Sequence, residues 1–359
     1  MEKSILSIQS HVSHGFVGNR AATFPLQILG WDVDVVNTVN FANHSGYRRR
    51  AGDGTKSTGE QLEVIFNGMN QNGLLEPSRL LTGYIPNGGC GAAVLNLARD
   101  LRGKTENLIY LLDPVLGDNG ALYVAADMIP LYRALLSTAT IITPNWFELE
   151  TLVGFQLDSL SALRKALEML HTEYRVPHVV ISSLPITKQR ATWLPTSLTS
   201  LSKPLTEGIT WAEEGLLCIA SSRLDSSSTS EVYTMAIPQI KGYFSGVGDL
   251  FSAMVLGHYY PEDRSTNPLA RAVCNAVRTT HAILRKTAIA SARVPGASRD
   301  GYTDDELDAA DVDRRPRRMK ARELRLIGSI DIISTAGKSA LKEDDGFEQM
   351  QPWRDFWTG

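Results

Sequence analysis

Glycine and an acid stand side by side in the stretch GVGD, which precedes an apolar run with helical spacing at residues 250–257. Gly246 and Gly248 allow close backbone approach to an anion, and the free amides and positive dipole of a helix N-terminus attract negative charge. Asp249, in the same turn, admits two interpretations. It caps its own helix by accepting hydrogen bonds from unpaired amides, or it is a base that accepts the proton of a hydroxyl group beside a bound phosphate.

A second acidic motif, DPVLGD, contains Asp113 and Asp118 and follows an apolar run. Mg²⁺ prefers hard oxygen ligands and is usually held by one or two carboxylates together with nucleotide oxygens. The pair is therefore a candidate magnesium site for phosphoryl transfer. A turn closed by a capping acid explains the same motif equally well.

Two familiar nucleotide motifs are absent from the sequence. No G-x-G-x-x-G follows the first predicted strand, where only Gly15 and Gly18 occur, and GDGTKSTG lacks the spacing of a P-loop. Three cysteines lie far apart in the sequence, which favours buried reduced thiols over a disulfide framework or a metal site. Any phosphate-binding site in this protein must therefore be formed by other residues.

Short apolar strands alternate with helical patterns through the first half of the chain. The predicted strands span residues 4–9, 31–39, 79–84, 107–113 and 139–145, and the predicted helices span about 18–29, 58–70, 89–101, 125–136 and 146–154. Strands alternating with helices indicate βαβ units, a mostly parallel sheet and helices on both of its faces. The predicted fold class is therefore α/β, in three α/β/α layers.

Polar or glycine-bearing loops follow these strands. They read QSHVSHG, TGY, DPVLGD and TPNWFE, and Ser182 and Ser183 follow the apolar run HVVI. Ligands of open α/β sheets bind at the carboxyl ends of the strands. We therefore expect these loops to surround one site.

Two stretches interrupt the regular pattern. Residues 184–209 mix proline, serine and threonine, and a serine-rich connector joins LLCIASS to EVYTMAI, which predicts a surface insertion and a hairpin. Residues 294–322 carry an acidic block and then a basic one, for which a solvated, partly disordered loop is favoured over a nuclear signal or nucleic-acid patch. We expect a single domain over residues 1–359 with insertions at about 184–230 and 294–320.

The composition is ordinary for a soluble globular protein, with 43% hydrophobic residues, 21% charged residues and a net charge of -3. Nucleic acid and acidic membranes favour a basic excess, so neither is an expected partner. No apolar run is long enough to span a bilayer, and the first residues form an alternating strand instead of a signal-peptide core. We expect a cytoplasmic location, with nuclear presence as the alternative.

Several of these motifs together resemble the pyridoxal kinases of the ribokinase-like superfamily. The motifs are LSIQSHVSHGFVGNRAATFPLQILG, NFANHSGY, LTGY, DPVLGD, IITPNWFE and GVGDLFSA, and they occur in the order and spacing of that family. The similarity covers roughly residues 4–183, resumes at about residue 231 and continues through ELRLIGSIDI. It implies a ribokinase-like fold and ATP-dependent phosphorylation of the 5′-hydroxymethyl group of pyridoxal, pyridoxine and pyridoxamine.

The resemblance also assigns roles on the substrate side of the site. Asp249 would be the catalytic base, in an anion hole made by Gly246, Val247 and Gly248. The ring-binding positions, which include two hydroxyl groups and three apolar or aromatic walls, are Ser10, Val17, Phe41, Ser45 and Tyr84. Val247 and Ser45 stand where mammalian members carry threonine, so a hydroxyl contact to phosphate is missing at Val247, and a change in ATP affinity is the expected effect.

The resemblance further assigns nucleotide and metal positions. Those that match metal-binding positions, including one for a monovalent cation, are Asp113, Asp118, Thr143 and Glu148. Those that match other ATP-contacting positions are Tyr123, Asn145, Ser182, Ser183 and Lys241, the last within the segment 240–242. The implied cofactors are ATP, Mg²⁺ with Zn²⁺ or another divalent ion as alternatives, and K⁺ or Na⁺. A homodimer is also implied.

Two other functions are compatible with the sequence. One is a ribokinase-like kinase for another small alcohol, such as a hydroxymethylpyrimidine or a sugar. The other is a pyridoxal phosphate binding or carrier protein that has lost catalysis, against which the three intact aspartates Asp113, Asp118 and Asp249 argue.

Overall fold

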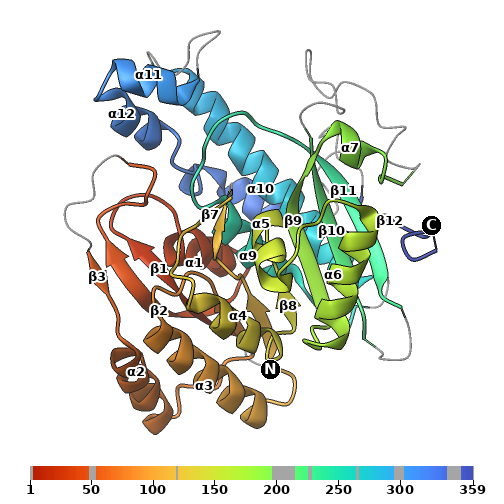
Figure 1. The fold of residues 1–359 in the computed structure, drawn as a ribbon. Helices are drawn as coiled ribbons and strands as arrows, with labels where there is room; N and C mark the ends of the chain where they lie inside the picture. Colours follow the sequence, from red (N-terminus) through yellow and green to blue (C-terminus); the bar gives the residue numbers. More distant parts are fainter. Residues whose placement is uncertain are drawn as a thin grey trace.

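A mostly parallel β-sheet forms the centre of the molecule in the computed structural model (Figure 1). The structure describes residues 3–47, 54–118, 120–195, 215–224, 229–263, 267–294, 303–337 and 349–358. Within these residues, 10 strands form one sheet in the order β12-β11-β10-β9-β8-β5-β4-β1-β2-β3. Their bounds are β1 Ser4–Val12, β2 Asp32–Phe41, β3 Thr55–Lys56, β4 Arg79–Thr82, β5 Ile109–Leu112, β8 Ile141–Ile142, β9 His178–Ile186, β10 Gly215–Ser222, β11 Glu231–Pro238 and β12 Gln351–Pro352.

The central strands β2, β1, β4, β5, β8 and β9 are parallel, and the strands added at both edges are antiparallel. Parallel neighbours align their carboxyl ends along one edge of the sheet, so the loops that follow them meet there. The predicted hairpin is present as β10 paired with β11. A separate pair, β6 Gly117–Asp118 with β7 Ala121–Leu122, follows β5 over the same edge.

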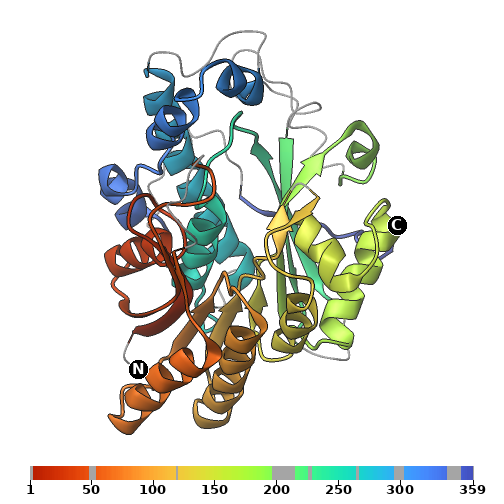
Figure 2. The ribbon, with the colours of Figure 1, turned by 60° about the vertical axis from the view of Figure 1, so that its left-hand side comes forward.

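Helices cover both faces of the sheet (Figure 2) and bury two apolar clusters against it. One face carries α2 Gly59–Gln71, α3 Gly88–Lys104, α4 Met128–Leu136, α5 Trp146–Val153 and α6 Leu160–Thr172. The other carries α1 Asn19–Ile28, α9 Val247–His258, α10 Pro268–Ala292 and α13 Ile330–Thr335. The remaining helices are α7 Lys188–Ala191, α11 Asp304–Ala310, α12 Arg314–Ala321 and η1 Ile327–Ser329. The predicted three-layer α/β/α class is confirmed.

Side-chain caps begin several of these helices where the sequence changes from loop to apolar periodicity. Thr58 and Gln61 form a capping box at α2, and Asn145 and Glu148 form another at α5. Ser159 accepts a hydrogen bond from an amide of α6. These caps satisfy amides that have no partner inside the helix, so they define where each helix starts.

The prediction that β9 ends before Ser182 is wrong. The strand continues to Ile186 because β10 pairs with it as an antiparallel neighbour. Ile181 faces Ile219 and Leu184 faces Leu217, so Ser182 and Ser183 together lie opposite a single residue of β10. The two serines therefore form a β-bulge, a feature that redirects side chains and often lies next to functional sites.

The prediction of a solvated loop over residues 294–322 is also wrong for its described part, which forms α11 and α12. The acidic block folds back on the basic one: Asp304 pairs with Arg314, Arg318 and Arg322, and Asp308 pairs with Arg314 and Arg318. Opposite charges that meet in space order a segment whose composition alone favours disorder. The other predicted insertion, at 184–230, lies partly outside the described residues.

Within the described residues, no helix is both long and apolar enough to cross a membrane.

Buried His178 predicts acid-sensitive stability. Its imidazole is 2% exposed and contacts Tyr259 Oη at 2.7 Å and Ser222 Oγ at 3.0 Å. Burial, with a smaller contribution from nearby His171, lowers the pKa of His178 from 6.5 to about 3. The unfolded chain therefore binds the proton first as the pH falls through 6.5, and stability decreases from there toward pH 3.

We expect the free energy of unfolding of the wild type to fall by up to about 1.4 kcal/mol per pH unit more steeply than that of His178→Gln in this window. Urea unfolding at several pH values measures the difference. His14 is exposed, so His14→Gln is the control substitution. Its free energy of unfolding should change with pH as that of the wild type does. Equal slopes for wild type and His178→Gln would contradict the prediction.

Candidate active site

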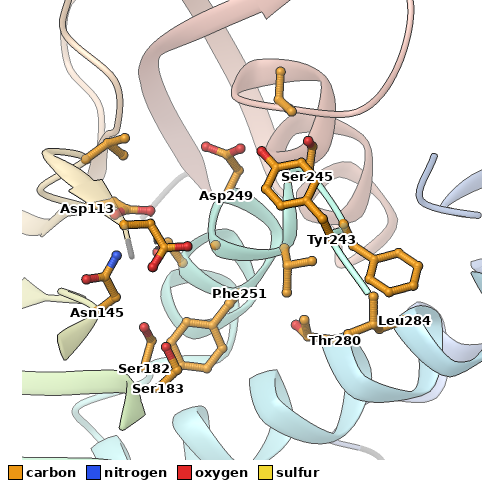
Figure 3. A pocket seen from close by; sticks show the side chains of 18 of the residues that line it. Asp113, Asn145, Ser182, Ser183, Tyr243, Ser245, Asp249, Phe251, Thr280 and Leu284 are labelled. Carbon is orange, nitrogen blue, oxygen red and sulfur yellow. Dashed lines mark hydrogen bonds between the residues drawn. The ribbon is translucent and has the colours of Figure 1, made fainter. Parts of the chain in front are cut away.

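One cavity of about 650 Å³ opens at the carboxyl ends of the parallel strands (Figure 3). Its walls come from the loops after β1, β2, β4, β5 and β8, from the bulge in β9, and from the N-terminal half of α9. The predicted site residues that line it are Ser10, Val17, Phe41, Ser45, Tyr84, Asp113, Asp118, Tyr123, Thr143, Asn145, Glu148, Ser182, Ser183, Gly246, Val247, Gly248 and Asp249. Lys241 is exposed and lies outside this lining, although its neighbours at 240 and 242 belong to it.

Asp249 does not cap its own helix. The helix α9 begins at Val247 with Gly246 as the N-cap residue, and no side chain makes a capping hydrogen bond there. The carboxylate of Asp249 instead accepts a hydrogen bond from the backbone N–H of Gly18, in the loop before α1. Figure 3 shows the side chain directed away from the body of α9, on the same side as Asp113. Burial raises the pKa of Asp249, and the Gly18 hydrogen bond partly opposes that increase.

The two glycines of the GVGD turn meet different requirements. Gly246 has φ 80°, in the left-handed region, and a Cβ atom there would collide with the carbonyl oxygen of Phe16. Gly248 has an ordinary φ, and a Cβ there would meet no atom within 4 Å. Gly246 therefore allows the chain to pass close to the loop after β1, whereas Gly248 leaves open space beside the free amides of the first turn.

Asp113 is tied to the same helix. Ser252 donates a hydrogen bond to Asp113 Oδ2 at 2.9 Å, and the hydroxyl groups of Ser252 and Thr143 lie 2.8 Å apart. Burial, and then repulsion by Asp249, raise the pKa of Asp113 to about 7, while the Ser252 hydrogen bond lowers it. The ionised carboxyl groups of Asp113 and Asp249 repel each other unless a proton or a cation lies between them.

Glu148 adds a third buried carboxyl group. It accepts hydrogen bonds from the backbone N–H groups of Asn145 at 2.8 Å and Leu116 at 3.1 Å. Burial, and then repulsion by Asp113, raise its pKa well above the ordinary value. Among the described residues no three His, Cys, Asp or Glu side chains form a complete metal cluster. A donor set of buried carboxylates with a hydroxyl group still suits a hard cation that takes its remaining ligands from phosphate and water.

The opposite part of the cavity is less acidic. Ser10 follows an irregularity in the β1–β2 pairing, where β2 carries one extra residue, Thr38. The hydroxyl group of Thr38 donates to the carbonyl oxygen of Tyr84 at 2.7 Å, which holds the loop after β4 against β2. Ser10, Phe41 and Tyr84 are thereby brought to one wall of the cavity. This wall can pack a flat ring and offer it a hydroxyl group.

Several residues of the cavity escaped the sequence analysis. Val277, Thr280, His281 and Leu284 of α10 line it, as does Phe251 of α9. Figure 3 shows Thr280 and Leu284 on α10, facing Ser182 and Ser183 across the cavity. The i, i+3, i+4, i+7 spacing of the α10 residues matches a helix face packed into a core, so no local pattern distinguishes them. His44, in the motif NFANHSGY, and Ser245, which precedes the GVGD turn, also line the cavity and had no assigned role.

A mostly parallel sheet, helices on both faces, and a glycine turn with an acid at a helix N-terminus facing the strand-end cavity define a ribokinase-like protein. The pyridoxal kinase of Leishmania donovani in complex with ADP and pyridoxamine superposes with a TM-score of 0.72 at 30% identity, covering 94% of this chain and 97% of that one. The same enzyme in complex with ADP has a TM-score of 0.74 over 98% of this chain and 99% of that one, at 28% identity.

Sequence comparison defines the family. The chain is 37% identical to the pyridoxal kinase of Arabidopsis thaliana, over 79% of this chain and 82% of that enzyme. It is 35% identical to the pyridoxal kinase of Homo sapiens, over 80% of this chain and 86% of that enzyme. The phosphomethylpyrimidine kinase family model matches residues 35–207. The chain belongs to the pyridoxal kinase family.

The contrast between the two glycines predicts that alanine substitution destabilises the protein at position 246 and has little effect at position 248. Gly246→Ala should lower the free energy of unfolding by about 1–3 kcal/mol, because alanine is strained at this φ and its Cβ meets the Phe16 carbonyl. Gly248→Ala should stay within about 0.5 kcal/mol of the wild type, because its Cβ points into open space. Urea unfolding of both variants measures these free energies, and equal losses in the two variants would contradict the prediction.

Proposed function

We propose that this chain transfers the γ-phosphoryl group of ATP to the 5′-hydroxymethyl group of pyridoxal, pyridoxine and pyridoxamine, with Asp249 as the general base. The observation that carries this proposal is the orientation of Asp249: its carboxylate faces the cavity and accepts from Gly18, and it does not cap α9. Membership in the pyridoxal kinase family supports the reaction and the substrates.

In this proposal the phosphoryl group is transferred directly from ATP to the substrate hydroxyl group. Asp249 accepts the proton of the substrate hydroxyl group as its oxygen forms a bond to the γ-phosphorus, and the bond from that phosphorus to the β–γ bridging oxygen breaks, releasing ADP. The free amides of Val247 and Gly248 at the start of α9 stabilise the negative charge on the transferred group. A carboxylate with a pKa raised by burial accepts a proton more readily than an exposed one.

The nucleotide occupies the acidic side of the cavity in this proposal. Asp113, Asp118, Thr143 and Glu148 would hold Mg²⁺, with Zn²⁺ or another divalent ion as alternatives, and a K⁺ or Na⁺ ion. Such cations would neutralise the phosphate charge and relieve the repulsion between the buried carboxyl groups. Asn145, Ser182 and Ser183 would contact the nucleotide together with Tyr123 and the segment 240–242.

The ring of the substrate occupies the other side, against Val17, Phe41 and Tyr84, with Ser10 and Ser45 as hydrogen-bonding partners.

We also infer a homodimer located in the cytoplasm. Light scattering of the purified protein, and imaging of the tagged full chain, test these two inferences; a monomer in solution or a nuclear location would overturn the corresponding one.

Replacing Asp249 tests the assignment of the base. Asp249→Asn should lower turnover by about 10²–10⁴-fold, because it removes the proton acceptor and keeps the size of the side chain. Formation of pyridoxal phosphate from pyridoxal, Mg-ATP and K⁺ measures turnover, while urea unfolding and ATP binding report the integrity of the fold. Near-normal turnover of Asp249→Asn would show that Asp249 is not the general base.

The same assay with other alcohols separates the alternatives. Preferential phosphorylation of a hydroxymethylpyrimidine, which the phosphomethylpyrimidine kinase match over residues 35–207 makes the main competitor, would change the substrate assignment. Tight binding of pyridoxal phosphate with no turnover by the wild type would indicate a carrier protein.

Glu148 tests the cation side. Leu116 and Asn145 donate to different oxygens of Glu148, so Glu148→Gln removes the negative charge and keeps an acceptor for one of these two amides. We expect the Mg²⁺ concentration required for half-maximal turnover to rise by about tenfold, the factor for about 1.4 kcal/mol of binding free energy. Glu150→Gln, in the same helix but outside the cavity lining, is the matched control. The same Mg²⁺ requirement in both variants would exclude Glu148 from the cation site.

A further inference from the structure

Glu323 connects the segment that follows α12 to the loops of the substrate side. It follows α12, its side chain is 10% exposed, and its carboxylate accepts three hydrogen bonds. The donors are the backbone N–H of Phe16 at 3.1 Å, the hydroxyl group of Tyr47 at 2.8 Å and Nε2 of His44 at 3.0 Å. They belong to two loops, one after β1 and one after β2, so a single carboxylate fastens both.

The hydrogen bonds define the tautomer of His44. The backbone N–H of Gly46 can only donate, and it donates to Nδ1 of His44 at 3.1 Å, so Nδ1 must carry a lone pair. The proton of the neutral ring is therefore on Nε2 and is donated to Glu323. Nδ1 also lies 3.0 Å from Ser245 Oγ, which donates to it. A chain of hydrogen bonds thus runs from Glu323 through His44 to the residue that precedes the GVGD turn.

The carboxylate of Glu323 packs closely against the backbone of the loop after β1. Gly15 has φ 96°, and a Cβ there would contact the Glu323 carboxylate, so glycine lets the loop after β1 lie directly against it. Burial alone would raise the pKa of Glu323, but the hydrogen bonds from His44, Tyr47 and the Phe16 amide outweigh burial and hold this pKa below its ordinary value. Glu323 is therefore a charged acceptor whose partners all come from loops of the site.

Among these partners, His44 belongs to the lining of the cavity, whereas Phe16 and Tyr47 do not. His44, Ser45 and Ser245 line it, and they belong to the ring-binding loop and the glycine turn. The acidic side instead depends on Ser252, Asn145 and backbone amides, none of which contacts Glu323 in its hydrogen bonds. Loss of Glu323 should therefore weaken binding of the vitamin substrate more than binding of ATP.

We propose that Glu323 is a positioning residue for the vitamin substrate: through its hydrogen bonds with His44 and Tyr47 it holds the loop that presents Ser45. The proposal rests on the proposed function, because it assigns the ring to this side of the cavity. Glu323 itself is not catalytic, since its contacts are with positioning groups and not with the reacting atoms.

Steady-state kinetics of Glu323→Gln test this role. The amide keeps the size of the side chain but loses the charge and directs an NH₂ group toward donors. We expect the KM for pyridoxal to rise by about tenfold, in line with loss of a charge-assisted hydrogen bond. The KM for ATP should stay within about twofold, because the ATP side retains its own hydrogen bonds.

Asp308→Asn is the matched control. Asp308 is a half-buried acid of the same C-terminal segment, and its carboxylate pairs with Arg314 and Arg318 and not with the loops of the site. Both KM values should remain those of the wild type. Glu323→Asp, which retains the charge, should recover part of the pyridoxal KM. Equal increases of both KM values in Glu323→Gln, or a loss of stability with unchanged KM values, would overturn the proposal.

Tyr47→Phe keeps the test decisive if Glu323→Gln does not fold. It removes one donor and retains the ring that packs 4.9 Å from the imidazole of His44. A smaller increase in the pyridoxal KM, of about threefold, is expected, and an unchanged pyridoxal KM would overturn the proposal. The activity of the wild type separates a failure of the proposed function from a failure of the role of Glu323. A wild type that does not phosphorylate pyridoxal contradicts the proposed function. An active wild type together with a variant whose pyridoxal KM is unchanged contradicts only the role of Glu323.

Discussion

Repulsion between buried carboxyl groups is the constraint on which the rest of this site depends. Asp113, Glu148 and Asp249 line one cavity, and burial raises the pKa of each. Such groups stay ionised only where donors or cations offset the cost of removing them from water. The protein supplies part of this compensation itself, through a hydroxyl group of α9 and backbone amides from three loops. The remaining charge is suited to cations that arrive with a phosphorylated ligand.

The fold meets this constraint by the alignment of parallel strands. Their carboxyl ends lie along one edge, which brings acidic, hydroxyl and glycine-bearing loops together without strain in the strands. The antiparallel strands β10 and β11 then extend the sheet, and the pairing of β10 with β9 creates the bulge that contains Ser182 and Ser183, both of which line the cavity. The C-terminal segment closes the other side, where ion pairs order α11 and α12 and Glu323 contacts two loops.

Much of this arrangement could be predicted from local patterns. The strands and helices of the first half lie within a few residues of their predicted positions, and 17 predicted site residues line a single cavity. The failures are equally informative. Capping by Asp249 was plausible from its position in the helix, but the competing donor, Gly18, lies more than 200 residues away in the sequence. The described part of the supposed loop at 294–322 forms two helices, in which charges from two blocks of the sequence meet in space.

The sequence by itself determined the order of strands and helices, the polar loops at the strand ends and the resemblance to pyridoxal kinases. Periodicity, capping and turn chemistry depend on neighbours within a few residues, so they can be recognised in a single chain. Only the tertiary structure decided which donors each carboxylate faces, that α10 lines the cavity, and that Glu323 joins two loops of the site. These features are contacts between residues remote in sequence, and they depend on the direction of side chains that no local pattern specifies.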